Sequence, residues 1–428
     1  MGTTSNTVER RDSVELTART IPLTAIPSFL KGVEIDGDGS MLSACNDFLT
    51  DELRKAEIKS ELTTQIPNLK TSNRVRDIYQ KHDFAKIKQL EKVAQDAIQP
   101  IVDNIKTNRY GAWTKVKYGD DLFLMSWSEH GCMWVRRTDV ITSENGTSFH
   151  NVIEQGTYTD EGQILGVSNY NLTTNVLLPD VIISAIIAFA LGDVVVEGLS
   201  FITAAFSLLM VNAASALGLE GFSCAIAATT LSTLSFTLVF VVVFIGLIVL
   251  YNILHVRYTV RLQVFNWDDK NDWKIADSYH DNAVIAGTDK DYTDPVTIPK
   301  FDNHPDLPPF IKPVEVLDNV CSYATIVYEN DNKFMEGCCM ALQFEKADLK
   351  QGFMWAFACQ FWRDNKQAAR DGIMDPKEYY DNANWNDNPL SFHIEATDSK
   401  IPISFKLDKL TGGEKNVYNA TININHLE

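Results

Sequence analysis

Basic side chains are scarce in this sequence, which has 38 Lys and Arg against 56 Asp and Glu and a formal net charge of −18. Such a chain would be repelled by a nucleic-acid backbone, so we expect no nucleic-acid partner. An anionic lipid surface is disfavoured for the same reason. A membrane partner would then be neutral lipid, sterol or a receptor.

The sequence also lacks the motifs of catalysis and of metal binding. Its eight histidines show no metal spacing, and its seven cysteines form no C-x2-C pair. No P-loop, dinucleotide fingerprint or nucleophile elbow occurs. We therefore expect a protein that is not an enzyme and needs no metal or cofactor, with its cysteines present as buried thiols.

Residues 1–20 lack the basic start and the apolar run of a secretory signal. We expect the protein to be made without a classical signal peptide. Residues 1–40 as a whole carry Ser, Thr, Pro, Gly and charge with no sustained apolar period, which predicts a flexible or surface-lying arm.

One long apolar segment, residues 181–254, stands out from the rest of the chain. Its second part, Gly221–Leu254, has no charged residue and is longer than the roughly 20 residues that a helix needs to cross a bilayer. Gly198–Leu219 is another uncharged run of spanning length, and the residues of a tight turn separate the two. The pattern predicts a membrane-interacting helical hairpin.

Particular side chains follow from this hairpin. Its turn would contain Gly218, Glu220 and Gly221. Asp193 and Glu197 lie one helical turn apart and would form an acidic lining if several copies assembled in a ring, although we favour a position outside the bilayer. The membrane-inserting residues would be Phe189, Phe201, Phe206, Met210, Phe222, Phe236, Phe240, Phe244, Ile248 and Leu250.

The flanking sequences differ in period. Leu49, Leu53 and Ile58, and then the apolar positions between Ile78 and Ile98, recur at helical spacing and predict amphipathic helices broken near Pro67 and Pro100. Alternating aromatic and branched residues predict strands elsewhere. The expected parts are an arm (1–40), amphipathic helices (41–108), a short β-meander (109–178), the hairpin (179–256), strands with a Pro-rich linker (257–313) and a β-rich module (314–428).

The fold class expected from these parts is α+β, with a helical N-terminal part, a central apolar helical hairpin and a β-sandwich-like C-terminal part. Within the last module, Trp355, Phe357, Phe361 and Trp362 cluster in sequence. They would either dock on a lipid interface or a sugar, or pack in the core, and we favour the core. Asp381–Asn388 is rich in turn formers and predicts an exposed loop.

In its layout of amphipathic helices around an apolar hairpin, the chain resembles the α-helical pore-forming toxins of the cytolysin A kind. The matching parts are Met41–Asn108 and Val181–Leu254, about a third of the chain, and the strand-rich residues after His255 depart from that family. The resemblance implies a protein that is made soluble, oligomerises and inserts its hairpin into a target bilayer.

Two other hypotheses fit the same sequence. An integral membrane protein would use the hairpin as an anchor, with soluble domains on one side of a cellular membrane. A large soluble protein would bury the segment as core. The expected partners are a bilayer of neutral lipid or sterol, further copies of the chain, and a receptor or glycan at the C-terminal module. The expected location is membrane-associated.

Overall fold

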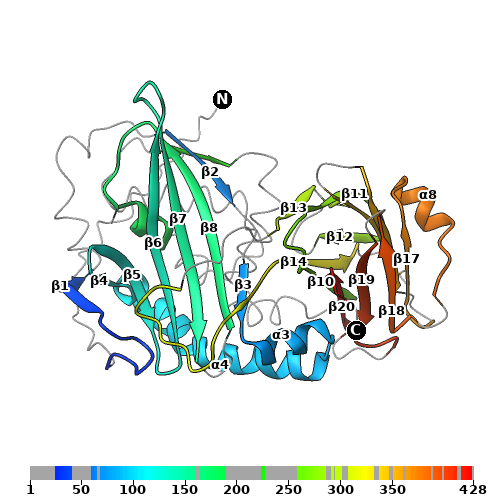
Figure 1. The fold of residues 1–428 in the computed structure, drawn as a ribbon, viewed down its shortest axis with the longest axis horizontal. Coiled ribbons are helices and arrows are strands. Elements are labelled where there is room, and N and C mark those ends of the chain that lie inside the picture. The colour runs from blue at the N-terminus through cyan, green and yellow to red at the C-terminus, as the bar shows by residue number, and fades with distance from the viewer. Residues whose placement is uncertain are drawn as a thin grey trace, which may run out of the picture.

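A computed structural model gives the fold of the chain. It describes residues 25–40, 59–64, 68–160, 164–180, 182–188, 223–226, 258–285, 291–293, 295–300, 307–331, 337–346, 350–359, 363–386, 389–397, 400–411 and 416–426. These residues form mostly strands, arranged in two sheets. Figure 1 shows long strands grouped on one side of the molecule, a second group of strands on the other, and helices along one edge.

The larger sheet runs through both groups of strands. Its first part is an antiparallel array in the order β1-β4-β5-β6-β7-β8-β3, with β2 and β9 attached beside β8. The bounds are β1 Glu34–Ser40, β2 Lys59–Thr64, β3 Asn68–Thr71, β4 Thr114–Tyr118, β5 Asp121–Trp127, β6 Gly131–Thr142, β7 Phe149–Thr159, β8 Ile164–Thr174 and β9 Ser223–Ile226.

The sheet then continues into the C-terminal part, because β3 pairs with β14 in the register Leu69↔Cys321. From β14 the order is β10-β20-β19-β18, with β12 also beside β14. The parallel β10–β20 pair is flanked by antiparallel neighbours. The bounds are β10 Thr259–Asn266, β12 Ala283–Ile285, β14 Asn319–Asn330, β18 Ser391–Ala396, β19 Ile401–Leu407 and β20 Val417–Ile424.

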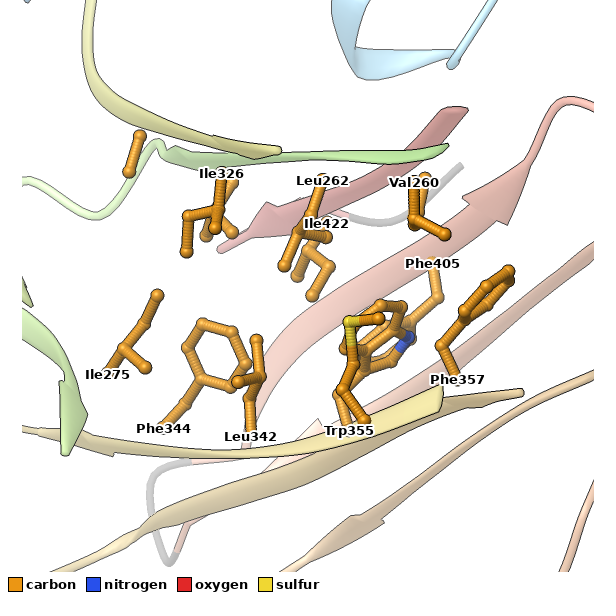
Figure 2. Close-up of a cluster of buried hydrophobic side chains, with 14 of the residues drawn as sticks. Val260, Leu262, Ile275, Ile326, Leu342, Phe344, Trp355, Phe357, Phe405 and Ile422 are labelled. Carbon is orange, nitrogen blue, oxygen red and sulfur yellow. The ribbon is translucent and has the colours of Figure 1, made fainter. Parts of the chain in front are cut away.

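A second sheet packs face to face on this C-terminal part. Its order is β13-β11-β15-β16-β17. Side chains from the two sheets point toward one another in Figure 2, where Leu342 and Phe344 face Leu262 and Ile326. All four are completely buried, and burying a side chain of this kind contributes roughly 1.5–3 kcal/mol. The bounds are β11 Trp273–Asp281, β13 Val296–Ile298, β15 Cys338–Lys346, β16 Gly352–Cys359 and β17 Lys366–Asp371.

Two helices connect the groups of strands. Ser72 caps α3 (Asn73–Gln80), and its hydroxyl accepts a hydrogen bond from the Val75 amide. The longer α4 (Phe84–Asn108) buries a stripe at helical spacing, whose members are Ile87, Leu90, Ala94, Ala97, Ile98, Ile101, Val102 and Ile105. A 3-10 turn, η1, follows at Arg109–Ala112, and a short helix, α8, lies at Pro376–Asp381.

The predicted fold class is wrong, because the described chain is mainly β-sheet and shows no helical N-terminal part with a helical hairpin. Lys59–Thr64, expected to be helical, pairs with β8, and Ser223–Ile226, inside the expected second hairpin arm, is a strand parallel to β2. Pairing with a neighbouring strand overrides local periodicity at both places. Pro100 also lies inside α4 rather than at its end.

The transmembrane helical hairpin is not supported. Among the residues that the structure describes, no helix combines the length and apolar character needed to cross a bilayer. Strands are found in the parts for which the sequence predicts them: β4, β5 and β6 lie within 109–178, β10 within 257–313, and β14, β15, β18, β19 and β20 within 314–428.

Candidate functional site

The residues proposed from the sequence as membrane-inserting, as the hairpin turn and as the acidic lining all lie outside the described residues. They fall in 189–222 and 227–250, on either side of β9. What the structure does describe is how the apolar segment begins, where it is interrupted, and where the chain resumes after it. A second place, on the C-terminal part, brings half-buried aromatic side chains and exposed charged side chains together.

The apolar segment begins at a fixed point beside the long strands. The guanidinium of Arg137 on β6 donates a 2.6 Å hydrogen bond to the Leu178 carbonyl and forms an ion pair with Asp180. Burial lowers the pKa of Arg137, although Asp139 nearby opposes this change. Residues 182–188 then form helix, and their apolar members have no exposed surface: Ile182, Ile183, Ala185, Ile186, Ile187 and Ala188.

The segment touches the larger sheet again at β9. Its four residues pair in parallel with β2 in the register Lys59↔Ser223 to Leu62↔Ile226, and β2 in turn pairs with β8. The next described strand along the chain is β10, which pairs with β14 on one side and β20 on the other. Along the chain, the longest part of the uncharged run therefore lies between two strands of the larger sheet, β9 and β10.

The second candidate site surrounds α8. We define the α8 patch as Tyr279, Lys377, Tyr380, Asp381 and Trp385. Lys377 Nζ lies 5.1 Å from the centroid of the Tyr279 ring and 2.6 Å from Asp381 Oδ2. The rings of Tyr279 and Tyr380 are 5.5 Å apart at 52°, and those of Tyr380 and Trp385 are 5.7 Å apart at 84°. The three aromatic side chains are half-buried, whereas Lys377 and Asp381 are exposed.

Local sequence explains why α8 forms here. Asp375 caps the helix by accepting a 2.8 Å hydrogen bond from the Glu378 amide, and Pro376 occupies the first helical position, where no N–H is needed. The helix lies on the outer face of the smaller sheet. Its buried Tyr379 packs on a floor of small or apolar side chains from the sheet: Ala341, Met354, Ala356 and Ala368.

The electrostatics keep the phenols neutral and the lysine charged near neutral pH. Burial, followed by the influence of Asp281, raises the pKa of Tyr279, and burial followed by Cys339 raises that of Tyr380. The hydrogen bond to Asp381 raises the pKa of the Lys377 ammonium. The patch thus presents aromatic faces, one cation and one carboxylate.

The sequence did not identify this patch. Trp355 and Phe357, the described members of the cluster considered for docking, are completely buried between the two sheets, as favoured from sequence; Phe361 and Trp362 lie outside the described residues. The available signal was Trp385, a large aromatic in a stretch of Asp and Asn. Tyr279 is separated from it by about a hundred residues, so sequence alone could not bring the two together.

Metal binding receives no support from the described residues, among which no three His, Cys, Asp or Glu side chains gather as ligands. The chain matches no protein-family model and no curated protein. Among solved structures it is similar to IP-1A from Alcaligenes faecalis, at 13% identity over 40% of this chain and 96% of that one, with a TM-score of 0.21. A likeness this low carries no argument about fold or activity.

Proposed function

We propose that this protein inserts into membranes and forms pores, using the apolar segment between residues 181 and 254. One observation carries the proposal: the uncharged run within Gly221–Leu254 is attached to the sheet at β9 and is followed by β10, a strand fixed between two neighbours. Two paired strands, β9 and β10, thus precede and follow a stretch of sequence that is apolar enough to enter a bilayer.

The start of the segment supports a protein that is made soluble. The apolar side chains within residues 182–188 are fully covered by protein, so this part needs no lipid to remove it from water. Insertion would then transfer apolar surface from protein to lipid. Such a transfer is small in free energy per residue, because both environments are apolar.

Ion pairs and a hydrogen bond fix the residues on either side of the apolar segment, and they would remain in place while the segment inserts. Arg261 on β10 pairs with Glu91 on α4, and Arg137 holds Leu178 and Asp180 at the start. A pore further requires several copies of the chain, so release of a trapped dye should depend steeply on protein concentration.

The test starts from intact chain expressed without detergent. Protein that remains in the supernatant after high-speed centrifugation is added to liposomes of neutral lipid with and without sterol, loaded with a self-quenched dye. We expect release by the unaltered chain. Phe244→Asp should abolish it, because an Asp at the bilayer centre costs about 2.5–3.5 kcal/mol, and Phe244→Leu is the matched control that should retain it.

Two outcomes would overturn the proposal. A chain that pellets with cellular membranes and resists alkaline extraction would be a retained integral protein. A soluble chain that releases no dye at any concentration would use the segment as protein core. In either case Phe244→Asp would act on membrane integration or on folding rather than on release.

A further inference from the structure

We infer that the α8 patch docks the phosphocholine headgroup of membrane phosphatidylcholine. The inference rests on the proposed function, since it names the lipid headgroup on which such a protein would dock. It is carried by side chains on β11, α8 and the residues after α8, all within the described C-terminal part. Figure 1 places α8 on the outer side of the smaller sheet, at the far end of the molecule from β1.

The patch already holds a cation in the geometry that a choline would need. The Lys377 ammonium lies over the face of Tyr279, 5.1 Å from its centroid, and 2.6 Å from an Asp381 carboxylate oxygen. An aromatic face with a carboxylate beside it is the combination that attracts quaternary ammonium groups. Because the Lys377 side chain is 58% exposed, it can move into solvent and leave this position to a ligand.

The rings form a preorganised wall rather than a flexible one. Tyr380 stands between Tyr279 and Trp385, in ring contact with both. All three pack on the buried floor beneath α8, and so their rotamers are restricted before any ligand arrives. A trimethylammonium group suits such a wall, because its methyl groups bury apolar surface while its charge faces the rings.

The phosphate of the headgroup has a cation on the same helix. Lys377, once displaced from Tyr279, remains on α8 beside the site and is exposed. A zwitterion with its positive end at Asp381 and its negative end at Lys377 would therefore satisfy both charges.

Charge also decides between lipid classes. An anionic headgroup without a cationic end would meet Asp381 directly, in a chain of net charge −18. A phosphoethanolamine headgroup offers a small, strongly hydrated ammonium, which gains less from an aromatic wall than a quaternary group does. Phosphatidylcholine is the occupant that uses every charged group and ring of the patch.

Binding is measured first with soluble phosphocholine by calorimetry on the full chain, apart from any bilayer. Tyr279→Leu should weaken binding about tenfold by removing the cation-binding face while keeping an apolar side chain. Tyr292→Leu is the matched control, because Tyr292 is an exposed tyrosine of the same part outside the patch, and it should bind as the unaltered chain does. Lys377→Met should tighten binding of plain choline, since the internal competitor is gone.

A second measurement uses vesicles. Flotation with phosphatidylcholine vesicles should recover the protein, vesicles of phosphatidylglycerol should not, and free phosphocholine should compete. Circular dichroism and thermal unfolding establish that each variant is folded before it is compared. Asp381→Asn gives a second, conservative variant at the patch and should also weaken phosphocholine binding.

The inference is overturned if phosphocholine fails to bind in the millimolar range, or if Tyr279→Leu and Tyr292→Leu bind it with the same affinity. It is also overturned if a soluble glycan rather than phosphocholine releases the protein from membranes. Failure of the proposed function looks different. If the protein binds phosphocholine normally but releases no dye, docking stands and pore formation is excluded. If it releases dye and added phosphocholine has no effect on the release, pore formation stands and docking through the α8 patch is excluded.

Discussion

Arg261 on β10 and Glu91 on α4 form a bidentate salt bridge, with guanidinium nitrogens 2.5 Å and 3.1 Å from the two carboxylate oxygens. Their side chains are only 11% and 13% exposed. The pair lies beside the cluster of Tyr79, Phe265 and Tyr323, through which the first half of α4 packs on the C-terminal strands. The second half of α4 packs on β5 and β6, where Ser128 Oγ donates to the Ala97 carbonyl. This helix therefore joins the two groups of strands.

Replacing one partner of this pair should be costly. We expect Arg261→Met to lower the free energy of unfolding by about 3 kcal/mol, because the Glu91 carboxylate stays buried without its counter-charge. Urea unfolding followed by circular dichroism measures the loss. The double variant with Glu91→Leu should recover most of it, and a double variant as unstable as the single one would show that the bridge is not the cause.

Gly156 on β7 is opposite Trp134 on β6, and a Cβ at this glycine would occupy the space of the indole ring. The ring is completely buried and its Nε1 donates to Glu154. We expect Gly156→Ala to cost about 2 kcal/mol by overpacking. In a Trp134→Leu background, the same change should cost below about 0.5 kcal/mol; equal costs in both backgrounds would exclude this explanation.

His82, in the turn between α3 and α4, attaches this turn to the C-terminal strands β19 and β20. Its ring nitrogens lie 2.5 Å from Thr421 Oγ1 and 2.9 Å from Ser404 Oγ, and its backbone is left-handed with a φ of 48°. We expect His82→Leu to cost about 3 kcal/mol, from unpaired buried hydroxyls and from backbone strain. His82→Asn, which tolerates this φ, should cost less. Amide exchange should rise in α3, β19 and β20 together.

His280 on β11 should make stability depend on pH. Burial lowers its pKa from 6.5 to about 4, although Asp291 and a hydrogen bond with the Ala283 backbone oppose the shift, and its Nε2 lies 3.0 Å from Thr293 Oγ1. Between these two values the unfolded chain binds a proton that the folded chain does not. Stability from this group is therefore full above pH 6.5 and falls, by about 1.4 kcal/mol per pH unit, as pH drops toward 4.

The measurement compares urea unfolding of the unaltered chain and His280→Gln from pH 7.5 to pH 4. Subtracting the two curves isolates this histidine from the other titrating groups. A difference that does not change with pH would mean that His280 is as easily protonated in the folded chain as in the unfolded one.

Strands with clear alternation were predictable from sequence. The aromatic and branched residues of Thr114–Tyr118 and Thr259–Asn266 alternate with polar residues along the sequence, which is the period of a strand. In the folded chain the burial does not alternate, and Thr259–Asn266 is buried on both faces except at Arg261. Lys59–Thr64 and Ser223–Ile226 carry no such signal. They are strands because β8 and β2 lie beside them, a relationship between distant residues that no local window contains.

The candidate site shows the same limit. The apolar segment was evident from composition, but the length of an uncharged run does not specify secondary structure, and its described portions are a buried helix and a short edge strand. In the α8 patch, Tyr279 meets Tyr380 only because β11 pairs with β15 beneath α8. That meeting depends on strand register, which sequence alone did not provide.

The position of β20 orders events while the chain is being made. This strand fills the space between β10 and β19, yet its residues 417–424 are translated about 150 positions after β10. A ribosome that has added residue 410 therefore holds a chain whose β10 lacks a neighbour on one side and whose His82 still awaits Thr421. Until β20 has been made, β10 therefore has one unpaired edge, and a chaperone that binds exposed strands has its longest opportunity there.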